Sequence, residues 1–65
     1  MMARDVARRI GSQMVATGRF QRVVVSENVA TYSIWIDASD KDGCDWVVRG
    51  MDDWIQIQEQ MGWPR

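Results

Sequence analysis

Apolar side chains near the N-terminus recur with the spacing of an amphipathic helix. At 100° per residue, six apolar side chains of residues 2–17 fall within one arc of about 140°; they are Met2, Ala3, Val6, Ala7, Ile10 and Met14. Arginines and other polar residues take the opposite side, and Gly11 lies among them. Gly18 follows, and glycine readily adopts the left-handed conformation that ends many helices. The pattern predicts a helix over 2–17 that ends at Gly18.

The middle of the chain changes to β-branched and aromatic residues, which favour strands. Two such segments, 19–26 and 29–37, flank Glu27-Asn28, which we interpret as a hairpin turn. A polar stretch over 37–45 leads to a short third strand over 46–49. Because the strands follow one another through short connections, we expect an antiparallel sheet in the order 1-2-3.

A second helix is predicted over 51–61, between Gly50 and the helix-ending Gly62 and Pro64. With 65 residues, the chain has room for one domain and a small core. We therefore expect a single small α+β domain over residues 1–65. Its element order is αβββα, and its two helices pack on one face of a three-stranded antiparallel sheet.

Two helices cover only one face of such a sheet, so the alternation of side chains along the strands predicts which residues stay outside. Tyr32, Ile34 and Ile36 form the more apolar set of the second strand and are expected to face the helices. Symmetric pairing around the two turns gives four expected cross-strand pairs: Val25 with Ala30, Val23 with Tyr32, Ile36 with Trp46, and Ile34 with Val48.

The face turned away from the helices then receives a mixture of apolar and guanidinium groups. Its expected rows are Phe20, Trp35 and Val47, then Arg22, Ser33 and Arg49, with Val24 and Thr31 beyond. Since Trp and Arg are enriched at interface hot spots, this face predicts a protein-binding site. The proposed site residues are Phe20, Arg22, Trp35, Val47 and Arg49.

Two alternatives to an exposed binding face stay open. A loop, or the C-terminal residues 63–65, folds over these side chains and covers them. Otherwise the first turn has an odd length, which sends Phe20 inward and turns Val23 and Val25 outward.

Charge is unevenly distributed along the chain, although the net charge is only −1. Residues 1–26 carry five arginines and one aspartate, whereas residues 27–65 carry eight acidic and three basic residues. Such asymmetry predicts two poles that offer secondary binding sites, the alternative being two solvated faces. The basic pole comprises Arg4, Arg8 and Arg9, and the acidic pole comprises Asp37, Asp40, Asp42 and Asp45.

The residues that enzymes most need are missing or isolated. The chain has no histidine, which is the commonest general base and metal ligand. Its single cysteine, Cys44, lies close to Asp42 and Asp45, whose charges disfavour a thiolate. A calcium loop over 38–49 would put Ala38 and Arg49 at positions that require carboxylates. We expect no enzyme, no cofactor and no metal site.

The predicted αβββα order resembles that of the double-stranded-RNA-binding domain, whose length is also similar. The resemblance is one of topology, because the family's basic anchor at the start of its second helix corresponds here to M-D-D-W (51–54). Those aspartates repel phosphate. A different nucleic-acid-binding mode would use Phe20, Arg22, Trp35 and Arg49 as a stacking platform, extended by the arginines of the first helix.

Together these features predict a small non-enzymatic protein-binding module that occludes a partner's surface. Very small proteins without catalytic groups often act as stoichiometric inhibitors or adaptors, so we expect an inhibitor of the phage or mobile-element type, with anti-CRISPR-like inhibitors of host defence as one instance. The alternatives are nucleic-acid binding and a homo-oligomeric structural subunit, such as a homodimer formed through the open sheet face. The uncharged stretch 28–36, which 10–18 equals in length, is too short to span a membrane, and a cytoplasmic protein is expected.

Overall fold

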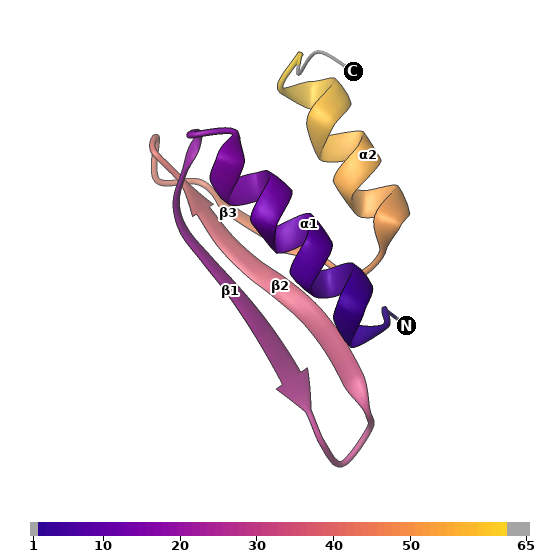
Figure 1. Cartoon of the computed structure of the whole chain (residues 1–65). Coiled ribbons are helices and arrows are strands. Elements are labelled where there is room, and N and C mark those ends of the chain that lie inside the picture. The colour runs from indigo at the N-terminus through magenta and orange to yellow at the C-terminus, as the bar shows by residue number, and fades with distance from the viewer. Residues whose placement is uncertain (1, 63–65) are drawn as a thin grey trace.

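A computed structural model of the chain describes residues 2–62. The elements are the helix α1 (Arg4–Ala16), the strands β1 (Phe20–Asn28), β2 (Ser33–Asp40) and β3 (Asp45–Val48), and the helix α2 (Met51–Gln60). The strands form one antiparallel sheet in the order β1-β2-β3. Both helices lie on the same side of this sheet, and the far end of the β1–β2 hairpin reaches beyond them (Figure 1). The predicted α+β fold and strand order are confirmed.

The helix α1 ends where the sequence predicts. Gly18 has a φ of 70°, the left-handed conformation that terminates the helix, and the Thr17 hydroxyl donates to the Met14 carbonyl oxygen at 2.7 Å. Its apolar side faces the sheet, and Ala7, Ile10 and Met14 are fully buried there. None of the helices within residues 2–62 is long and apolar enough to cross a membrane.

The prediction that Gly11 lies on the polar side of α1 was wrong. Gly11 is buried against β1, where a Cβ atom added to it would lie 3.6 Å from Cγ2 of Val25 and 3.8 Å from Cγ1 of Val23. Gly11 therefore lies within the contact between α1 and β1, and a Cβ atom there would meet β1 at ordinary van der Waals distance.

One core joins the helices to the covered face of the sheet. Its buried apolar members are Met2, Ala7, Ile10, Met14, Phe20, Ile36, Ala38, Val48, Trp54 and Ile57. The indole of Trp54 spans the space between the helices, because its Nε1–H donates to Oε1 of Gln13 at 2.8 Å. The largest buried side chain is thereby both packed and hydrogen-bonded.

The first hairpin turn lies later in the chain than predicted. β1 continues through Asn28, and residues 29–32 form the connection. The Asn28 side chain stabilises it by accepting the Ala30 N–H at 3.0 Å, the local bond that makes Asn common in turns. Tyr32 ends the turn in the left-handed region, with a φ of 54°, and is 76% exposed. The prediction that Tyr32 faces the helices was wrong.

The later turn changes the strand register but preserves the faces. Val25 lies opposite Ile36 instead of Ala30, and Val23 lies opposite Ala38 instead of Tyr32. In the second hairpin, Ile36 lies opposite Val48 and Ala38 opposite Trp46. The pairing partner moves by six residues in the first hairpin and by two in the second. Both numbers are even, so each side chain stays on the side of the sheet that alternation assigned to it.

Phe20 is the exception, and its predicted place on the outer face was wrong. Phe20 lies opposite Asp40 and Arg22 opposite Ser39, so two steps along β1 match one step along β2. This bulge at Gln21 reverses the alternation and turns Phe20 into the core, where it is 9% exposed. Val23 stays on the helix side, so a bulge at the strand end, and not an odd turn length, moves Phe20 inward.

Candidate functional site

The sheet face opposite the helices carries most of the predicted site; we call it the open face. Its cross-strand rows, read from the register, are Arg22–Ser39–Asp45, Val24–Asp37–Val47 and Ser26–Trp35. Arg22, Trp35 and Val47 thus lie on the face that the sequence assigned to them, although in three different rows. Residues 63–65, which we considered as a cover for this face, lie outside the described residues.

Trp35 is the largest side chain of the open face, and its ring is held in place. Its Nε1–H donates to Oδ2 of Asp37 at 3.0 Å, and the Ser26 hydroxyl donates to the same oxygen at 3.1 Å. The three side chains therefore form one small network across two strands. A ring whose orientation is already fixed loses little rotational freedom when another molecule packs on it.

Beside Trp35 the face is hollowed because β3 is short. β3 pairs with β2 only over residues 36–39, so the first residues of β2 have no β3 neighbour. A cavity of about 290 Å³ lies there, lined by Ser33, Ile34, Trp35 and Arg49. Arg49 is exposed and directly follows β3. A hollow bordered by a tryptophan and an arginine suits an apolar or acidic side chain from another molecule.

Two exposed valines flank Asp37 in the central row of the open face. Val24 is 41% exposed and Val47 is 45% exposed. Their apolar surface lies beside the Trp35 network. The centre of the open face is therefore largely apolar around one hydrogen-bonded carboxylate, as in the central part of many protein–protein interfaces.

The row Arg22–Ser39–Asp45 of the open face is polar, and its side chains form hydrogen bonds with one another. The guanidinium of Arg22 donates to Oγ of Ser39 at 3.4 Å, and the Ser39 hydroxyl donates to Oδ1 of Asp45 at 2.8 Å. Ser39 is only 8% exposed, although it points to the open side. The Arg22 side chain thus lies across the strands and covers this serine.

The four aspartates of the predicted acidic site do not form one array. Asp37 and Asp45 lie on the open face, where each accepts hydrogen bonds from neighbouring side chains. Asp42 is exposed in the turn after β2. Asp40, at the end of β2, belongs to a separate cleft at the other side of the sheet.

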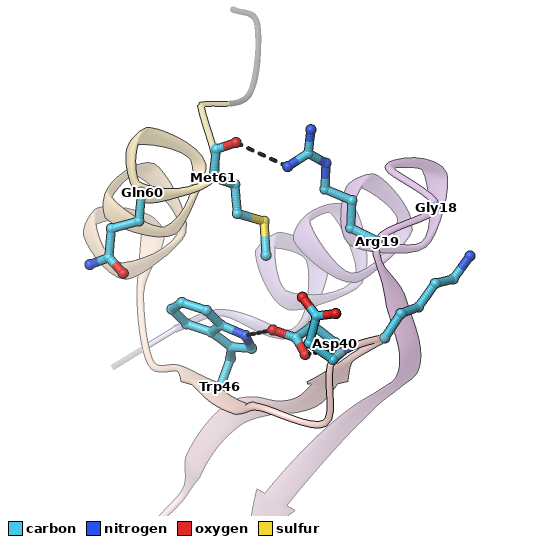
Figure 2. A pocket seen from close by; sticks show the side chains of 8 residues that line it. Gly18, Arg19, Asp40, Trp46, Gln60 and Met61 are labelled. Carbon is cyan, nitrogen blue, oxygen red and sulfur yellow. Dashed lines mark hydrogen bonds between the residues drawn. The ribbon is translucent and has the colours of Figure 1, made fainter.

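That cleft lies between the end of α2 and the β2–β3 turn (Figure 2). It has a volume of about 440 Å³ and is lined by Gly18, Arg19, Asp40, Lys41, Asp42, Trp46, Gln60 and Met61. Arg19 closes one end by donating from Nη1 to the Met61 carbonyl oxygen at 2.9 Å. The sequence did not suggest this cleft, because its lining residues come from three distant parts of the chain.

Asp40 organises the turn beside the cleft. The Trp46 Nε1–H donates to its Oδ2 at 3.0 Å, and the backbone N–H groups of Asp42 and Cys44 each donate to its Oδ1 at 2.9 Å. These bonds, that of Trp46 first, hold the pKa of Asp40 below its usual value of 3.8. The carboxylate is saturated with local donors, which indicates a structural role.

The predicted basic site lies on the other side of the sheet from the open face. Arg4 of α1 forms an exposed ion pair with Glu27 of β1, with Nη2 and Oε2 2.7 Å apart. Arg8 lines the groove between α1 and β1. Because α1 packs on the covered face, these arginines do not extend the platform around Trp35 (Figure 1).

The described residues contain no group of three or more Cys, Asp or Glu side chains that could hold a metal ion. Cys44 is exposed in the β2–β3 turn. Comparisons with protein-family models, curated proteins and solved structures gave no match to this chain. The open face, with Trp35 as its largest side chain, is the strongest candidate for a functional site among the described residues.

Proposed function

We propose that this protein is a small non-enzymatic protein-binding module that uses its open face to cover a functional surface of another protein, as a stoichiometric inhibitor or adaptor. The observation that carries the proposal is the Trp35 site. An indole hydrogen-bonded to Asp37 stands at the rim of a hollow of about 290 Å³, and Arg49 is among the residues that line this hollow.

The physical support is that this surface is already organised before any partner binds. Binding normally orders flexible side chains at a cost of about 0.5–1.5 kcal/mol for each. Trp35 is held by its own hydrogen bond, and the flanking valines have little rotational freedom to lose. Trp and Arg are also the residue types most often found at the energetic centre of interfaces.

The partner that this face fits is a protein surface of mixed polarity with one projecting side chain. The projecting group, aliphatic, aromatic or acidic, enters the hollow beside Trp35 and Arg49. Around it, an apolar patch contacts Val24 and Val47, and hydrogen-bonding groups meet the polar row at Arg22.

Nucleic acid suits this face less well. The two arginines near its ends are accompanied by two aspartates, Asp37 and Asp45, on the same surface. Carboxylates at this position oppose a phosphate backbone, whose neutralisation supplies most non-specific affinity. The narrower expectation of an inhibitor from a phage or mobile element stays a prediction from size and charge.

The test begins with capture of the partner from the native host by the full chain, followed by purification of that partner. Calorimetric titration is then expected to give one chain per partner site. Trp35→Ala should weaken binding by about 2 kcal/mol, or roughly thirtyfold. Ile55→Ser is the control for loss of exposed apolar surface outside the open face. Ile55 is 41% exposed, close to the 45% of Val47 on the open face, but it belongs to α2.

Three results would count against the proposal. One is an unchanged affinity in Trp35→Ala, and another is an equal loss in Ile55→Ser. The third is retention of the chain on random-sequence DNA or RNA at low salt that disappears steeply as salt rises, because this dependence is the signature of phosphate binding.

A further inference from the structure

The two edges of the sheet differ in how well they are protected. β3 is four residues long, and such a short strand is itself a protection against pairing with other chains. β1 is nine residues long and pairs on one side only, with β2. Natural proteins usually blunt an edge of this length with lysine, proline or a bulge.

β1 has such protection at one end only. Its bulge lies at Gln21, next to the start of the strand. From there the sequence Arg22-Val23-Val24-Val25-Ser26 contains neither lysine nor proline, and it pairs with β2 without a break in register. The centre of the free edge is therefore a regular strand, able to accept another strand.

Apolar surface lies on both sides of this edge. On the open side, Val24 is 41% exposed. On the helix side, Val25 is 41% exposed and Val15 of α1 is 64% exposed. These two side chains line a groove of about 510 Å³ between α1 and β1, together with Arg8, Gly11, Ser12 and Val23. A strand added to β1 would bury apolar groups above and below the sheet.

We infer that the strand added here is β1 of a second copy of this chain, antiparallel to the first and centred on Val24. The sequence of β1 is complementary to itself in that register. Valines 23 and 25 of one copy lie opposite valines 25 and 23 of the other, Arg22 lies opposite Ser26, and Gln21 lies opposite Glu27. Among these paired residues of β1, no two like charges face each other. Like charges directly opposite would oppose pairing.

At longer range, the charges of β1 are also compatible with this dimer. The two Arg22 side chains are four residues apart along the paired strands, about 13 Å at the usual rise, which exceeds the screening length of about 8 Å at physiological salt. Glu27 is already paired with Arg4 of its own chain. The net charge of −1 per chain adds little repulsion between copies.

The register also determines the shape of the dimer. Pairing Val24 with Val24 keeps the helices of both copies on the same side, because opposite residues of antiparallel strands point to the same face. The result is a six-stranded sheet with one continuous open face. A homodimer thus forms through the β1 edge, whereas the sequence suggested the open face itself. The pairing is independent of the proposed function, and it leaves two Trp35 sites available.

Sedimentation equilibrium of the full chain tests the inference. At rising concentration, the mass should approach twice that of the 7.5 kDa chain. Val24→Arg places two guanidinium groups opposite each other at the dimer axis and should weaken dimerisation by at least about tenfold. Val47→Arg is the matched control, since Val47 shares the row and the exposure of Val24 but lies on β3.

A charge-swap experiment makes the assignment specific to the β1 edge. Val24→Arg mixed with Val24→Glu should recover a dimer that neither variant forms well alone, because the opposed charges then attract. Circular dichroism of each variant confirms that the monomer is folded. A mass that stays at one chain over all concentrations would overturn the inference. So would dissociation by Val47→Arg in place of Val24→Arg.

Discussion

The two faces of the sheet are built from the same strands but in opposite ways. On β2, Ile36 and Ala38 point to the helices and are 0% and 1% exposed. Their neighbours Trp35 and Asp37 point to the open face and are hydrogen-bonded to each other. The covered face is held mainly by close packing of buried apolar side chains. On the open face, half-exposed groups are linked by side-chain hydrogen bonds.

This difference assigns stability and recognition to different sides of one strand. A chain of 65 residues has little excess stability, about 3–10 kcal/mol at the usual value per residue. Substitutions on the covered face are therefore expected to unfold the protein. Substitutions on the open face are expected to change binding while the fold persists. Four pairs of variants test or refine this contrast.

The largest effect is expected from Trp54→Ala in the core. Trp54 is 2% exposed, and truncation would leave a cavity and remove its bond to Gln13. The expected loss is about 3–5 kcal/mol, comparable with the whole stability. Urea denaturation followed by circular dichroism measures it. Val47→Ala on the open face should cost less than about 1 kcal/mol, and an equal cost in both would remove the distinction between the faces.

The next largest difference in stability is expected between variants of the two aromatic residues that the sequence placed in one row. Phe20→Ala should lower the free energy of unfolding by about 3 kcal/mol, because the bulge turns this ring into the core. Trp35→Ala should lower it by about 1 kcal/mol, since it removes one hydrogen bond and a partly exposed ring. Equal losses by urea denaturation would contradict the bulge and its reversal of the faces.

Phe20 also shows where sequence reasoning stops. Local composition and periodicity were enough for the five elements, for their antiparallel order and for the left-handed glycine that ends α1. Alternation along the strands also placed Arg22, Trp35 and Val47 on the correct face. A bulge gives no such local signal, because it arises from how β1 meets β2 at its end.

The turn and the cleft were missed for a related reason. The position of the first turn depends on an Asn28 side-chain bond and on a left-handed Tyr32, which is an uncommon conformation for a bulky residue. Asp40 was assigned to a secondary binding site because it is one of several aspartates clustered in a polar stretch, which predicts an acidic pole. Its structural role depends on Trp46, six residues away, and is visible only once the strands are paired.

A smaller effect, confined to acid pH, is expected at Asp40. Its pKa in the folded chain lies below the usual 3.8, so its ionised form is favoured by folding. The resulting stability is present above pH 3.8 and is lost as the pH falls through the lower, folded pKa. Asp40→Asn should reduce this loss of stability at acid pH, which thermal denaturation at a series of pH values measures. Asp42→Asn, in the same turn but exposed, is the control and should leave the loss of stability at acid pH unchanged.

The smallest effect is expected at the boundary of the covered face, where α1 meets β1. Here a substitution should raise the stability of the chain instead of lowering it. Gly11→Ala should raise stability by about 0.5–1 kcal/mol, because alanine favours the helix and its Cβ would meet Val25 and Val23 at ordinary contact distances of 3.6 and 3.8 Å. A Cβ atom added at Gly18 would have no neighbour within 4 Å, but Gly18 has a φ of 70°, so Gly18→Ala should lower stability by about 1 kcal/mol. Thermal denaturation of both variants separates packing from backbone conformation. If Gly11→Ala instead destabilised the chain, α1 would have to lie closer to β1 than described, and the groove beside the free strand edge would be correspondingly narrower.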